Sequence, residues 1–418
     1  MRTVELINTG SELLLGSVRD AHLQWLGQEL FGLGFRISRQ CTVPDGEAIR
    51  EALKDSLERS SLVIVTGGLG PTTDDITREI AAELTGRKLL LHRETLQRIH
   101  ERCRSRGFSF QERMARQAMV PEGALVLTNE NGTAPGLHLP GSNQKGGGVP
   151  DVFLLPGPPR ELQPMARAFL LPFLATLSAS GEGTGCRVYR VTGMGESLLE
   201  AKLGLSLTQR GDLEVGYCAR PNEVDFRLIG PTHVLEEVDP LVRAAVGDHL
   251  VTDEGRVALE EVVVGLLAEQ GATLATAESC TGGLLANRIT DVPGASVVFL
   301  EGFVTYSNHS KTSQLGVPRD LIAAHGAVSE PVVRAMAEGA LRSSGATFAL
   351  ATTGIAGPGG GSPEKPVGTV WLALASRDGV TETWMERFPS DRPAFKRMTS
   401  QSALDRLRRR LKDPPQIP

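Results

Sequence analysis

The sequence predicts an α/β protein of three domains, on three observations. Short apolar runs alternate with longer helical patterns, which is typical of mostly parallel sheets covered by helices. Glycine-rich turns follow several of the apolar runs. The chain has 418 residues, which is too many for one ordinary core. Shifts in composition place the domains at 1–175, 176–254 and 255–414, the middle one being a small α+β unit.

The first domain is expected to alternate strands and helices, with a flexible loop insertion at Gly141–Gly148. The predicted strands are Val4–Thr9, Arg36–Val43, Leu62–Thr66 and Val152–Leu155, and the predicted helices are Ala21–Leu33, Gly46–Arg59, a helix ending near Leu84, and Glu94–Met119.

Three loops of this domain are expected at the carboxyl ends of parallel strands, where open α/β sheets bind ligands. They are Gly10–Gly16, Gly67–Asp75 and Pro156–Glu161. Glycines in the middle loop let backbone amides approach a phosphate, and Asp74 and Asp75 could hold a divalent cation against it. The alternative is that Thr73 or Asp74 caps the next helix while Asp75 complements its dipole.

Further ligand contacts are open to two interpretations. Glu12 could belong to a helix start or lie near a metal. The segment Asn131–Gly136 could be a turn or a loop that contacts the ligand. Glu161 could be an acid in the first turn of a helix or a general base. The candidate substrate-binding residues of this domain are Glu12, Gly67, Gly68, Gly70, Pro71, Thr72, Asn131, Thr133, Gly157, Pro158 and Glu161.

The middle domain lies between a linker at Ser178–Gly185 and a boundary at Asp253–Gly255. Its predicted strands are Cys186–Thr192, Leu213–Ala219 and Val224–Gly230, and its predicted helices are Glu196–Leu205 and Val234–Val246.

The last domain is expected to alternate helices and strands as well. Its predicted helices are one after Val257, Glu330–Arg342 and Arg392–Leu411. Its predicted strands are one before Ser279, one at Tyr306, Phe348–Thr353, Thr369–Ala375 and Val380–Phe388.

The last domain is organised around Thr273–Gly283, which reads as a strand, a sharp turn and a helix beginning near Gly282. Ser279 at the strand end suits a nucleophile. A serine needs a base, and Lys311 can serve if desolvation lowers its pKa, with Tyr306 relaying a proton or orienting the lysine. Amides of Gly282, Gly283 and Gly354 would form an oxyanion hole, which indicates acyl transfer.

Each of these residues has another interpretation. Ser279 could be a helix cap, Lys311 a solvated lysine and Tyr306 a half-buried aromatic. Cys280 is an alternative nucleophile, although its side chain should point away from the pocket of Ser279. His309 and His325 have no recognisable acid partner, and Arg392 either clamps a phosphate or carboxylate or is solvated.

The composition of the chain limits the kinds of binding partner that we expect. A net charge of −5 gives no basic excess for nucleic acid or an anionic membrane, and the run from Arg406 to Lys412 fits a solvated helix face. The five scattered cysteines form no C-x-x-C pair, so neither a disulfide framework nor a zinc site is expected. Without a signal-peptide pattern or a long apolar run, we expect a cytoplasmic protein that binds no membrane.

These motifs together resemble the competence/damage-inducible CinA family. The matching motifs are Gly-Ser-Glu-Leu-Leu-Leu-Gly at 10–16, Thr-Gly-Gly-Leu-Gly-Pro-Thr at 66–72 with Asp74 and Asp75, Leu-Pro-Gly-Pro-Pro-Arg-Glu at 155–161, Gly-Met-Gly-Glu-Ser at 193–197, Ala-Glu-Ser-Cys-Thr-Gly-Gly at 277–283, Tyr-Ser-Asn-x-x-Lys at 306–311, Gly-Ala-Val-Ser-Glu at 326–330 and Gly-Ile-Ala-Gly-Pro at 354–358. One departure is Arg19–His22, where the family usually has an Asn-Thr-Asn-like run.

The resemblance implies a bifunctional pyridine-nucleotide enzyme. The first domain is similar to molybdopterin-binding proteins and implies an ADP-ribose pyrophosphatase with Asp74 and Asp75 at a divalent metal, Mg or Co, with K⁺ as a further candidate ion. The middle domain is similar to KH-type connecting domains.

The last domain is similar to a nicotinamide mononucleotide (NMN) amidohydrolase that uses no cofactor, with Ser279 as nucleophile assisted by Lys311 and Tyr306. Its implied substrate contacts are Cys280, Thr281, Gly282, Gly283, Asn308, Thr353, Gly354, Gly357 and Arg392. A homodimer is also implied. The alternative is a nucleotide- or pterin-binding protein acting in competence or DNA repair without catalysis, although Gly193–Glu196 lacks the Gly-x-x-Gly spacing of nucleic-acid-binding KH loops.

Overall fold

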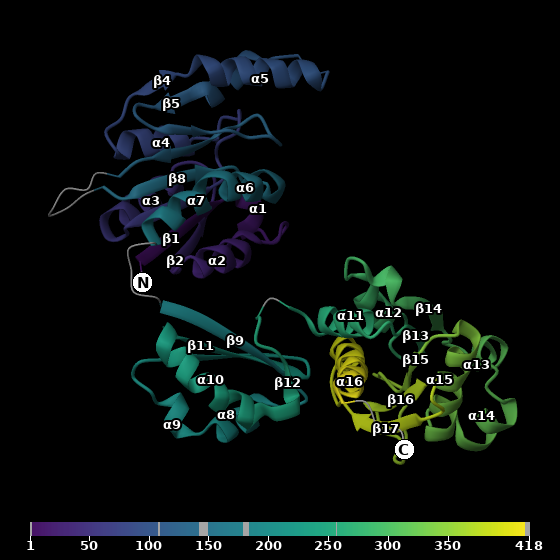
Figure 1. Ribbon diagram of the computed structural model, residues 1–418. Coiled ribbons are helices and arrows are strands. Elements are labelled where there is room, and N and C mark those ends of the chain that lie inside the picture. The colour runs from purple at the N-terminus through teal and green to yellow at the C-terminus, as the bar shows by residue number, and fades with distance from the viewer. Residues whose placement is uncertain (1, 108, 142–148, 179–183, 256, 414–418) are drawn as a thin grey trace. The chain divides into compact units, whose positions relative to one another are not determined.

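The computed structural model describes residues 2–107, 109–141, 149–178, 184–255 and 257–413. It forms two compact units, Met1–Thr184 and Gly185–Pro418 (Figure 1). The segments predicted as the middle and last domains therefore share the second unit. Most of the predicted loop insertion at 141–148 and of the predicted linker at 178–185 lies outside the described residues.

The first unit is built on a six-stranded sheet in the order β2-β1-β3-β8-β7-β6. Strands β2, β1, β3 and β8 run parallel, and β7 and β6 are added antiparallel. The strands are β1 (Arg2–Thr9), β2 (Phe35–Val43), β3 (Leu62–Thr66), β6 (Leu125–Leu127), β7 (Gly136–Leu139) and β8 (Asp151–Leu155). The predicted mostly parallel α/β sheet is thus confirmed.

Helices cover both faces of this sheet because its strand residues alternate between two cores. Leu6 and Ile64 pack in one core, and Ile7 and Val65 pack in the other. The helical segments are α1 (Ser11–Leu14), α2 (His22–Gly32), α3 (Ala48–Arg59), α4 (Thr77–Leu84), α5 (Arg93–Ser105), α6 (Pro159–Met165), a π-helical turn (Ala166–Leu170) and α7 (Leu171–Ser178). The sequence analysis indicated α6 only through Glu161 as a first-turn acid, which the structure confirms, and it missed α7.

The predicted helix Glu94–Met119 is wrong beyond its first half. Helix α5 ends at Ser105, and Gly107 follows with φ of +73°, a left-handed conformation that ends helices. A 3₁₀ helix (Glu112–Ala118) and β5 (Met119–Pro121) come next, and β5 pairs with β4 (Leu89–Leu91). In Figure 1, this small ribbon and α5 lie together beyond the main sheet of the unit.

The second unit begins with a four-stranded sheet in the order β10-β11-β9-β12 and its helices, as the predicted α+β pattern requires. The elements are β9 (Thr184–Thr192), α8 (Glu196–Leu203), α9 (Leu205–Thr208), β10 (Glu214–Arg220), β11 (Glu223–Pro231), α10 (Thr232–Val246), a 3₁₀ turn (Gly247–His249) and β12 (Leu250–Thr252). The sequence analysis missed the three-residue β12.

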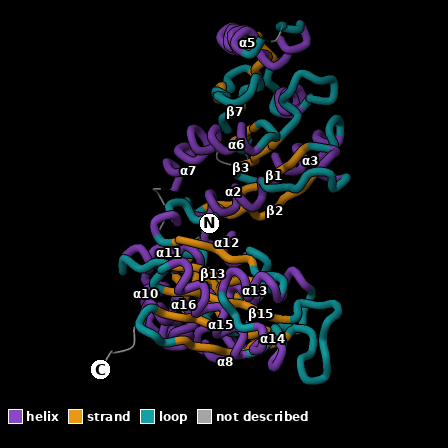
Figure 2. The backbone as a smooth tube through the Cα atoms, turned by 90° about the vertical axis from the view of Figure 1, so that its right-hand side faces the viewer, coloured by secondary structure: helices purple, strands orange, loops and turns teal. Residues whose placement is uncertain are grey.

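The rest of the second unit is a three-layer α/β fold on a five-stranded sheet in the order β14-β13-β15-β16-β17. Figure 2 shows β13 and β15 among helices α12, α13, α15 and α16. The strands are β13 (Leu274–Glu278), β14 (Phe299–Val304), β15 (Phe348–Gly354), β16 (Thr369–Ser376) and β17 (Thr381–Arg387). The helices are α11 (Leu259–Glu269), α12 (Leu284–Thr290), a 3₁₀ turn (Ala295–Val297), α13 (Asn308–Leu315), α14 (Arg319–His325), α15 (Glu330–Ser344) and α16 (Arg392–Lys412).

The two faces of this sheet differ in side-chain size. Leu274 and Leu350 pack with residues of α11, α12 and α16, whereas Ala275 and Ala349 pack with residues of α15. Small side chains let a helix lie close to a sheet, and the larger ones fill the space under α11 and α16, which lie side by side in Figure 1.

Helix α16 also holds the β9–β12 sheet. Arg408 is 1% exposed and donates to the carbonyl of Leu250 at 2.9 Å. Gln401 donates to Glu223 Oε2 at 3.0 Å and accepts from Arg288 of α12 at 2.7 Å. Buried polar groups that satisfy one another in this way fix the relative position of the elements they join.

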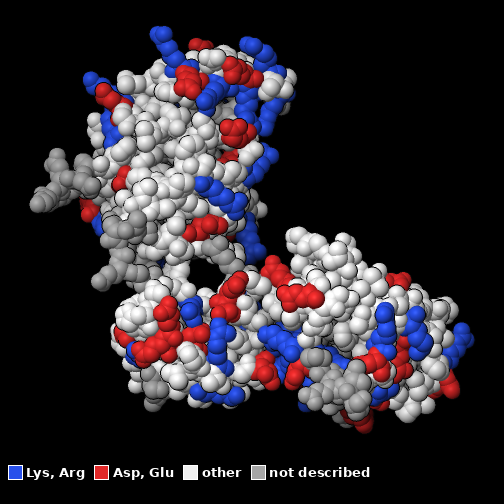
Figure 3. All heavy atoms as spheres, viewed as in Figure 1, with Lys and Arg blue, Asp and Glu red and all other residues white. Residues whose placement is uncertain are grey.

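The described surface mixes charges. On the face shown in Figure 3, Lys and Arg alternate with Asp and Glu among larger neutral areas. Within the described ranges, no helix combines the length and the apolar character needed to cross a lipid bilayer.

Candidate active sites

The turn after β13 presents Ser279 at the carboxyl end of the sheet. The Ser279 amide donates to the carbonyl of Thr352 on β15 at 3.0 Å, which continues the sheet by one residue. Gly282 and Gly283 then adopt φ of +59° and +91°, and residues with a Cβ rarely do so. Helix α12 starts at Leu284, two residues later than predicted. The glycine pair therefore allows the sharp turn that leaves Ser279 at the strand end.

Lys311 lies against Ser279. Its Nζ atom is 3.0 Å from Ser279 Oγ and donates to the carbonyl of Thr305 at 2.8 Å. The lysine is 1% exposed, and this burial lowers the pKa of its amine. The alternative of a solvated lysine is wrong. A desolvated amine within hydrogen-bond reach of a serine hydroxyl is the arrangement that a Ser–Lys nucleophile requires.

The local sequence explains how Lys311 reaches this place. Strand β14 ends at Val304, and the Thr305 amide donates to the carbonyl of Glu278 at 2.8 Å. Ser307 then caps α13 by accepting from the Ser310 amide at 3.1 Å. Because α13 starts at Asn308, Lys311 completes its first turn.

Tyr306 lies after the end of β14 and not within a strand. It is 59% exposed, and its hydroxyl accepts from Arg392 Nη2 at 2.5 Å. No described hydrogen bond joins it to Lys311, so the expectation that Tyr306 orients this lysine is not met. Arg392 is exposed, as the alternative of a solvated arginine expects, and its Nη1 also donates to the carbonyl of Gly357 at 3.1 Å. Tyr306 and Arg392 instead form a polar pair next to the nucleophile turn.

Lys396 adds a second cation that the sequence analysis missed. It follows Arg392 by one turn of α16, and a Cβ at Gly282 would lie 3.7 Å from its Nζ atom. The spacing of four residues was the available signal, since residues four apart share a helix face. The first turns of α16 thus bring two cations to the nucleophile turn.

Several predicted contact residues have buried side chains. Cys280 is 4% exposed, and burial raises the pKa of its thiol to about 12, which argues against Cys280 as the nucleophile. The hydroxyl of Thr281 shares a hydrogen bond with that of Thr352 at 2.8 Å, and Thr353 donates to the carbonyl of Ala327 at 2.9 Å. A ligand would therefore meet Cys280 and Thr281 through their backbone amides.

Three other residues predicted to contact the substrate each have a different environment. Asn308 is exposed at the start of α13. Gly357 is held by Arg392 through its carbonyl. A Cβ at Gly354 would lie 2.8 Å from the carbonyl oxygen of Thr369, so close strand packing is sufficient to explain this glycine. The amides of Cys280 and Thr281 make no hydrogen bond to another described residue, and they are better oxyanion donors than Gly354.

Glu278 is a second residue that the sequence analysis missed. It is 1% exposed, and its carboxylate accepts from the amides of Gly283 at 2.9 Å, Leu285 at 3.0 Å and Ala286 at 2.8 Å. These are among the first N–H groups of α12, which have no partner within a helix. The Glu278 carboxylate therefore fixes the turn that carries Ser279. An acid at a strand end just before a helix start was the available signal.

In the first unit, the loops predicted to bind ligands converge. The Gly67 amide donates to the carbonyl of Leu155 at 2.9 Å. A Cβ on Gly157 would lie 3.6 Å from Gly67 Cα, and one on Gly67 would lie 2.7 Å from the carbonyl oxygen of Thr9. The ends of β1, β3 and β8 thus meet at Gly67, where only glycine fits. We call the loops that meet here, 9–16, 67–75 and 156–161, the glycine-turn site.

Glu161 and Asn131 belong to the same edge. Glu161 accepts from Asn129 Nδ2 at 2.9 Å, and Asn131 Nδ2 donates to the carbonyl of Arg160 at 2.9 Å. A Cβ at Gly132 would lie 1.9 Å from Glu161 Oε2. The segment 129–133 is therefore held against the loop of Glu161 and is not an isolated turn. Pro158 is the N-cap residue of α6.

The two predicted metal ligands have different surroundings. Asp75 accepts from the amide of Thr72 at 2.9 Å and from its hydroxyl. Asp74 is exposed, and the nearby Thr72 hydroxyl lowers the pKa of its carboxyl. The capping alternative is wrong, because Ile76 is the N-cap residue of α4. Glu12 is also exposed, with its carboxylate against Gly10.

No group of three or more His, Cys, Asp or Glu side chains suited to a metal ion occurs among the described residues. The charged, exposed carboxylate of Asp74 fits a cation that takes its remaining oxygen ligands from water and phosphate, as Mg²⁺ commonly does.

Arg78 is a buried cation behind the glycine turn, and the sequence analysis missed it. It is 0% exposed and donates to the carbonyl of Leu69 at 2.9 Å and to that of Arg116 at 3.2 Å. Arg116 in turn donates to the carbonyl of Thr72 at 3.2 Å. Both arginines hold the loop by its carbonyl oxygens. Glu79 pairs with Arg116 at 3.0 Å and lies 4.0 Å from Arg78, so these three side chains leave one net positive charge beneath the loop, which favours an anion on it.

Comparison with known proteins agrees with this architecture. Residues 256–411 match the family described as CinA C-terminal domain, and residues 5–176 match the probable molybdopterin binding domain. A CinA-like protein of Akkermansia muciniphila is 51% identical over 96% of this chain and 95% of its own length. A CinA-like protein of Dictyoglomus thermophilum is 40% identical over 97% of this chain and 98% of its own.

A solved structure is also similar. The competence/damage inducible protein CihA from Agrobacterium tumefaciens is 44% identical, covering 36% of this chain and 93% of its own, with a TM-score of 0.35. The two domain matches and the near full-length relatives agree with the motifs read from the sequence. The chain belongs to the CinA family.

Proposed function

We propose that the serine site, made of Ser279, Lys311, Tyr306, Arg392 and Lys396, hydrolyses the carboxamide of NMN to nicotinate mononucleotide and ammonia. The observation that carries the proposal is the 3.0 Å contact between the buried Lys311 amine and Ser279 Oγ. Arg392 and Lys396 supply positive charge for the phosphate of the mononucleotide.

In the proposed reaction, neutral Lys311 takes the proton from Ser279 Oγ as this oxygen attacks the carboxamide carbon. The amides of Cys280 and Thr281 stabilise the oxyanion that forms. Lys311 then gives the proton to the leaving nitrogen, and ammonia departs from the acyl-Ser279 intermediate. Water, deprotonated by Lys311, hydrolyses this ester and releases the nicotinate product.

We further propose that the glycine-turn site hydrolyses ADP-ribose to AMP and ribose 5-phosphate. The support is the convergence of three loops at Gly67 above the buried Arg78. Asp74 would hold the divalent cation, Mg or Co, whose charge neutralises the diphosphate when bound. Glu161 would accept a proton from the attacking water. A homodimer and a cytoplasmic location stay predictions.

A chelator should separate the two activities. We expect EDTA to leave ammonia release from NMN unchanged, because proton transfer at the serine site uses Lys311, and to lower AMP formation from ADP-ribose at least tenfold. Both products are measured in one preparation, and excess Mg²⁺ should restore AMP. Loss of ammonia release in EDTA would contradict the proposed Ser–Lys mechanism.

The pH dependence of ammonia release should follow Lys311. Its protonated form cannot accept the serine proton, so kcat/KM should rise tenfold per pH unit below the pKa of Lys311 and level off above it. Burial lowers this pKa, so the plateau should begin below the ordinary range of lysine. Profiles from pH 5 to 10 test this, with Tyr306→Phe as control.

Because Tyr306 contacts Arg392 and not Lys311, the control variant should keep the inflection of the wild type. A wild-type profile that falls as the pH rises would rule out a lysine base.

A further inference from the structure

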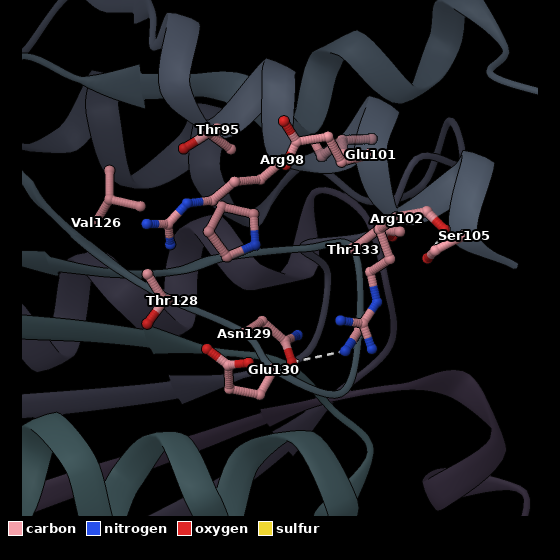
Figure 4. Close-up of a pocket in the computed structure, with 13 residues that line it drawn as sticks. Thr95, Arg98, Glu101, Arg102, Ser105, Val126, Thr128, Asn129, Glu130 and Thr133 are labelled. Carbon is pink, nitrogen blue, oxygen red and sulfur yellow. Dashed lines mark hydrogen bonds between the residues drawn. The ribbon is translucent and has the colours of Figure 1, made fainter.

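A cavity of about 420 Å³ lies between α5 and the segment 126–135 of the first unit. We call it the α5 pocket. Its volume lies within the range of small-molecule sites. Figure 4 shows Arg98 and Arg102 of α5 on one wall, with Thr128 and Asn129 on the other.

The α5 pocket adjoins the glycine-turn site. Asn129, which lines the pocket, donates to Glu161 Oε2 at 2.9 Å and to the carbonyl of Ala134 at 2.8 Å. The amide of Gly132, another lining residue, donates to Asn129 Oδ1 at 2.7 Å. The Asn129 side chain therefore lines the pocket and also contacts Glu161, the proposed general base. A ligand in the pocket would extend toward Glu161.

The two arginines of the pocket differ. Arg98 is neutralised by Glu94 at 2.9 Å. Among the described residues, Arg102 forms no ion pair, and its Nε atom is buried without a hydrogen-bond partner. Figure 4 shows the end of the Arg102 side chain near Asn129, and Glu101 and Glu130 also line the pocket. A guanidinium that has no ion pair and lies near hydroxyls and an amide suits a ligand that carries both an anion and hydroxyl groups.

We propose that the α5 pocket binds a phosphorylated ribose, with Arg102 on the phosphate and the hydroxyls of Thr128 and Thr133 on the sugar. The proposal rests on the proposed hydrolysis of ADP-ribose, whose two products, AMP and ribose 5-phosphate, both contain this group. The pocket then holds one half of the substrate while the diphosphate lies at the glycine turn.

The test is calorimetric titration of the full-length protein with AMP and, separately, with ribose 5-phosphate, both in EDTA. We expect one of the two compounds to bind. The compound that binds identifies which half of ADP-ribose occupies the pocket. Arg102→Ala should weaken that binding about tenfold or more, because a hydrogen bond to a charged group is lost. Arg102→Lys keeps the charge and should weaken it less.

Arg104→Ala is the matched control. Arg104 is exposed on the same helix and does not line the pocket, so this variant should bind as the wild type does. The proposal is overturned if neither compound binds the wild type, or if Arg102→Ala and Arg104→Ala behave alike.

Turnover separates this proposal from the proposed function. If ADP-ribose is hydrolysed with a KM that does not depend on Arg102, the pocket assignment fails and the activity stands. If ADP-ribose is not hydrolysed but binding depends on Arg102, the activity fails and the pocket assignment stands.

Discussion

Replacing Ser279 with Ala should lower ammonia release from NMN by a factor of at least about 10⁴, since no other nucleophile is in place. Cys280 cannot substitute, because its thiol is buried and the pKa of this thiol is raised to about 12. Lys311→Met should cause a loss of similar size, because removing either member of a nucleophile–base pair disables the pair. Ammonia release at substrate saturation measures both.

Two controls make this result specific. AMP formation from ADP-ribose should be unchanged in both variants, since the serine site and the glycine-turn site belong to different units. Lys88→Met, at an exposed lysine of the first unit, should release ammonia at the wild-type rate. Joint loss of both activities in Ser279→Ala would contradict separate sites.

Replacing Glu278 should have the second-largest effect. Glu278→Ala leaves three amides at the start of α12 without an acceptor, and each unsatisfied buried group costs about 1–3 kcal/mol. We expect the free energy of unfolding of the second unit to fall by about 3–5 kcal/mol and ammonia release to fall at least about 100-fold. Urea unfolding and steady-state kinetics measure the two effects.

Glu278→Gln separates position from stability. It keeps the side-chain length but replaces one accepting oxygen with an NH₂ group that faces backbone donors. We expect a clear loss of kcat with little change in KM, since Arg392 and Lys396 are untouched. Glu269→Gln, at an exposed acid of α11, is the control. Wild-type kcat in Glu278→Gln would show that the carboxylate does not position Ser279.

The sequence was sufficient to predict the elements that have strong local signals. The apolar run before Ser279 and the glycine pair after it predicted a strand and a turn, and the structure has both. The contact of Ser279 with Lys311 also followed, because a strand end and a helix start separated by a few residues restrict where Lys311 can lie.

Long-range contacts were not predictable in the same way. Glu278 looks like an ordinary strand acid until the fold brings three amides to it, and Arg78 looks like a surface residue of α4 until Leu69 and Arg116 cover it. The helix predicted at Glu94–Met119 failed because its charged pattern continued past Gly107, whose conformation decides the helix end. Short strands such as β12 are stabilised by their partners rather than by their own sequence.

Helix α16 has a consequence for how such chains can be divided and recombined. Its first turn carries Arg392 of the serine site, while Gln401 and Arg408 hold the β9–β12 sheet. A cut at 254–255 would leave Arg408 without the Leu250 carbonyl and Gln401 without Glu223. The chain divides into its two compact units at 184–185, so exchange of modules between related proteins is expected to be tolerated there first.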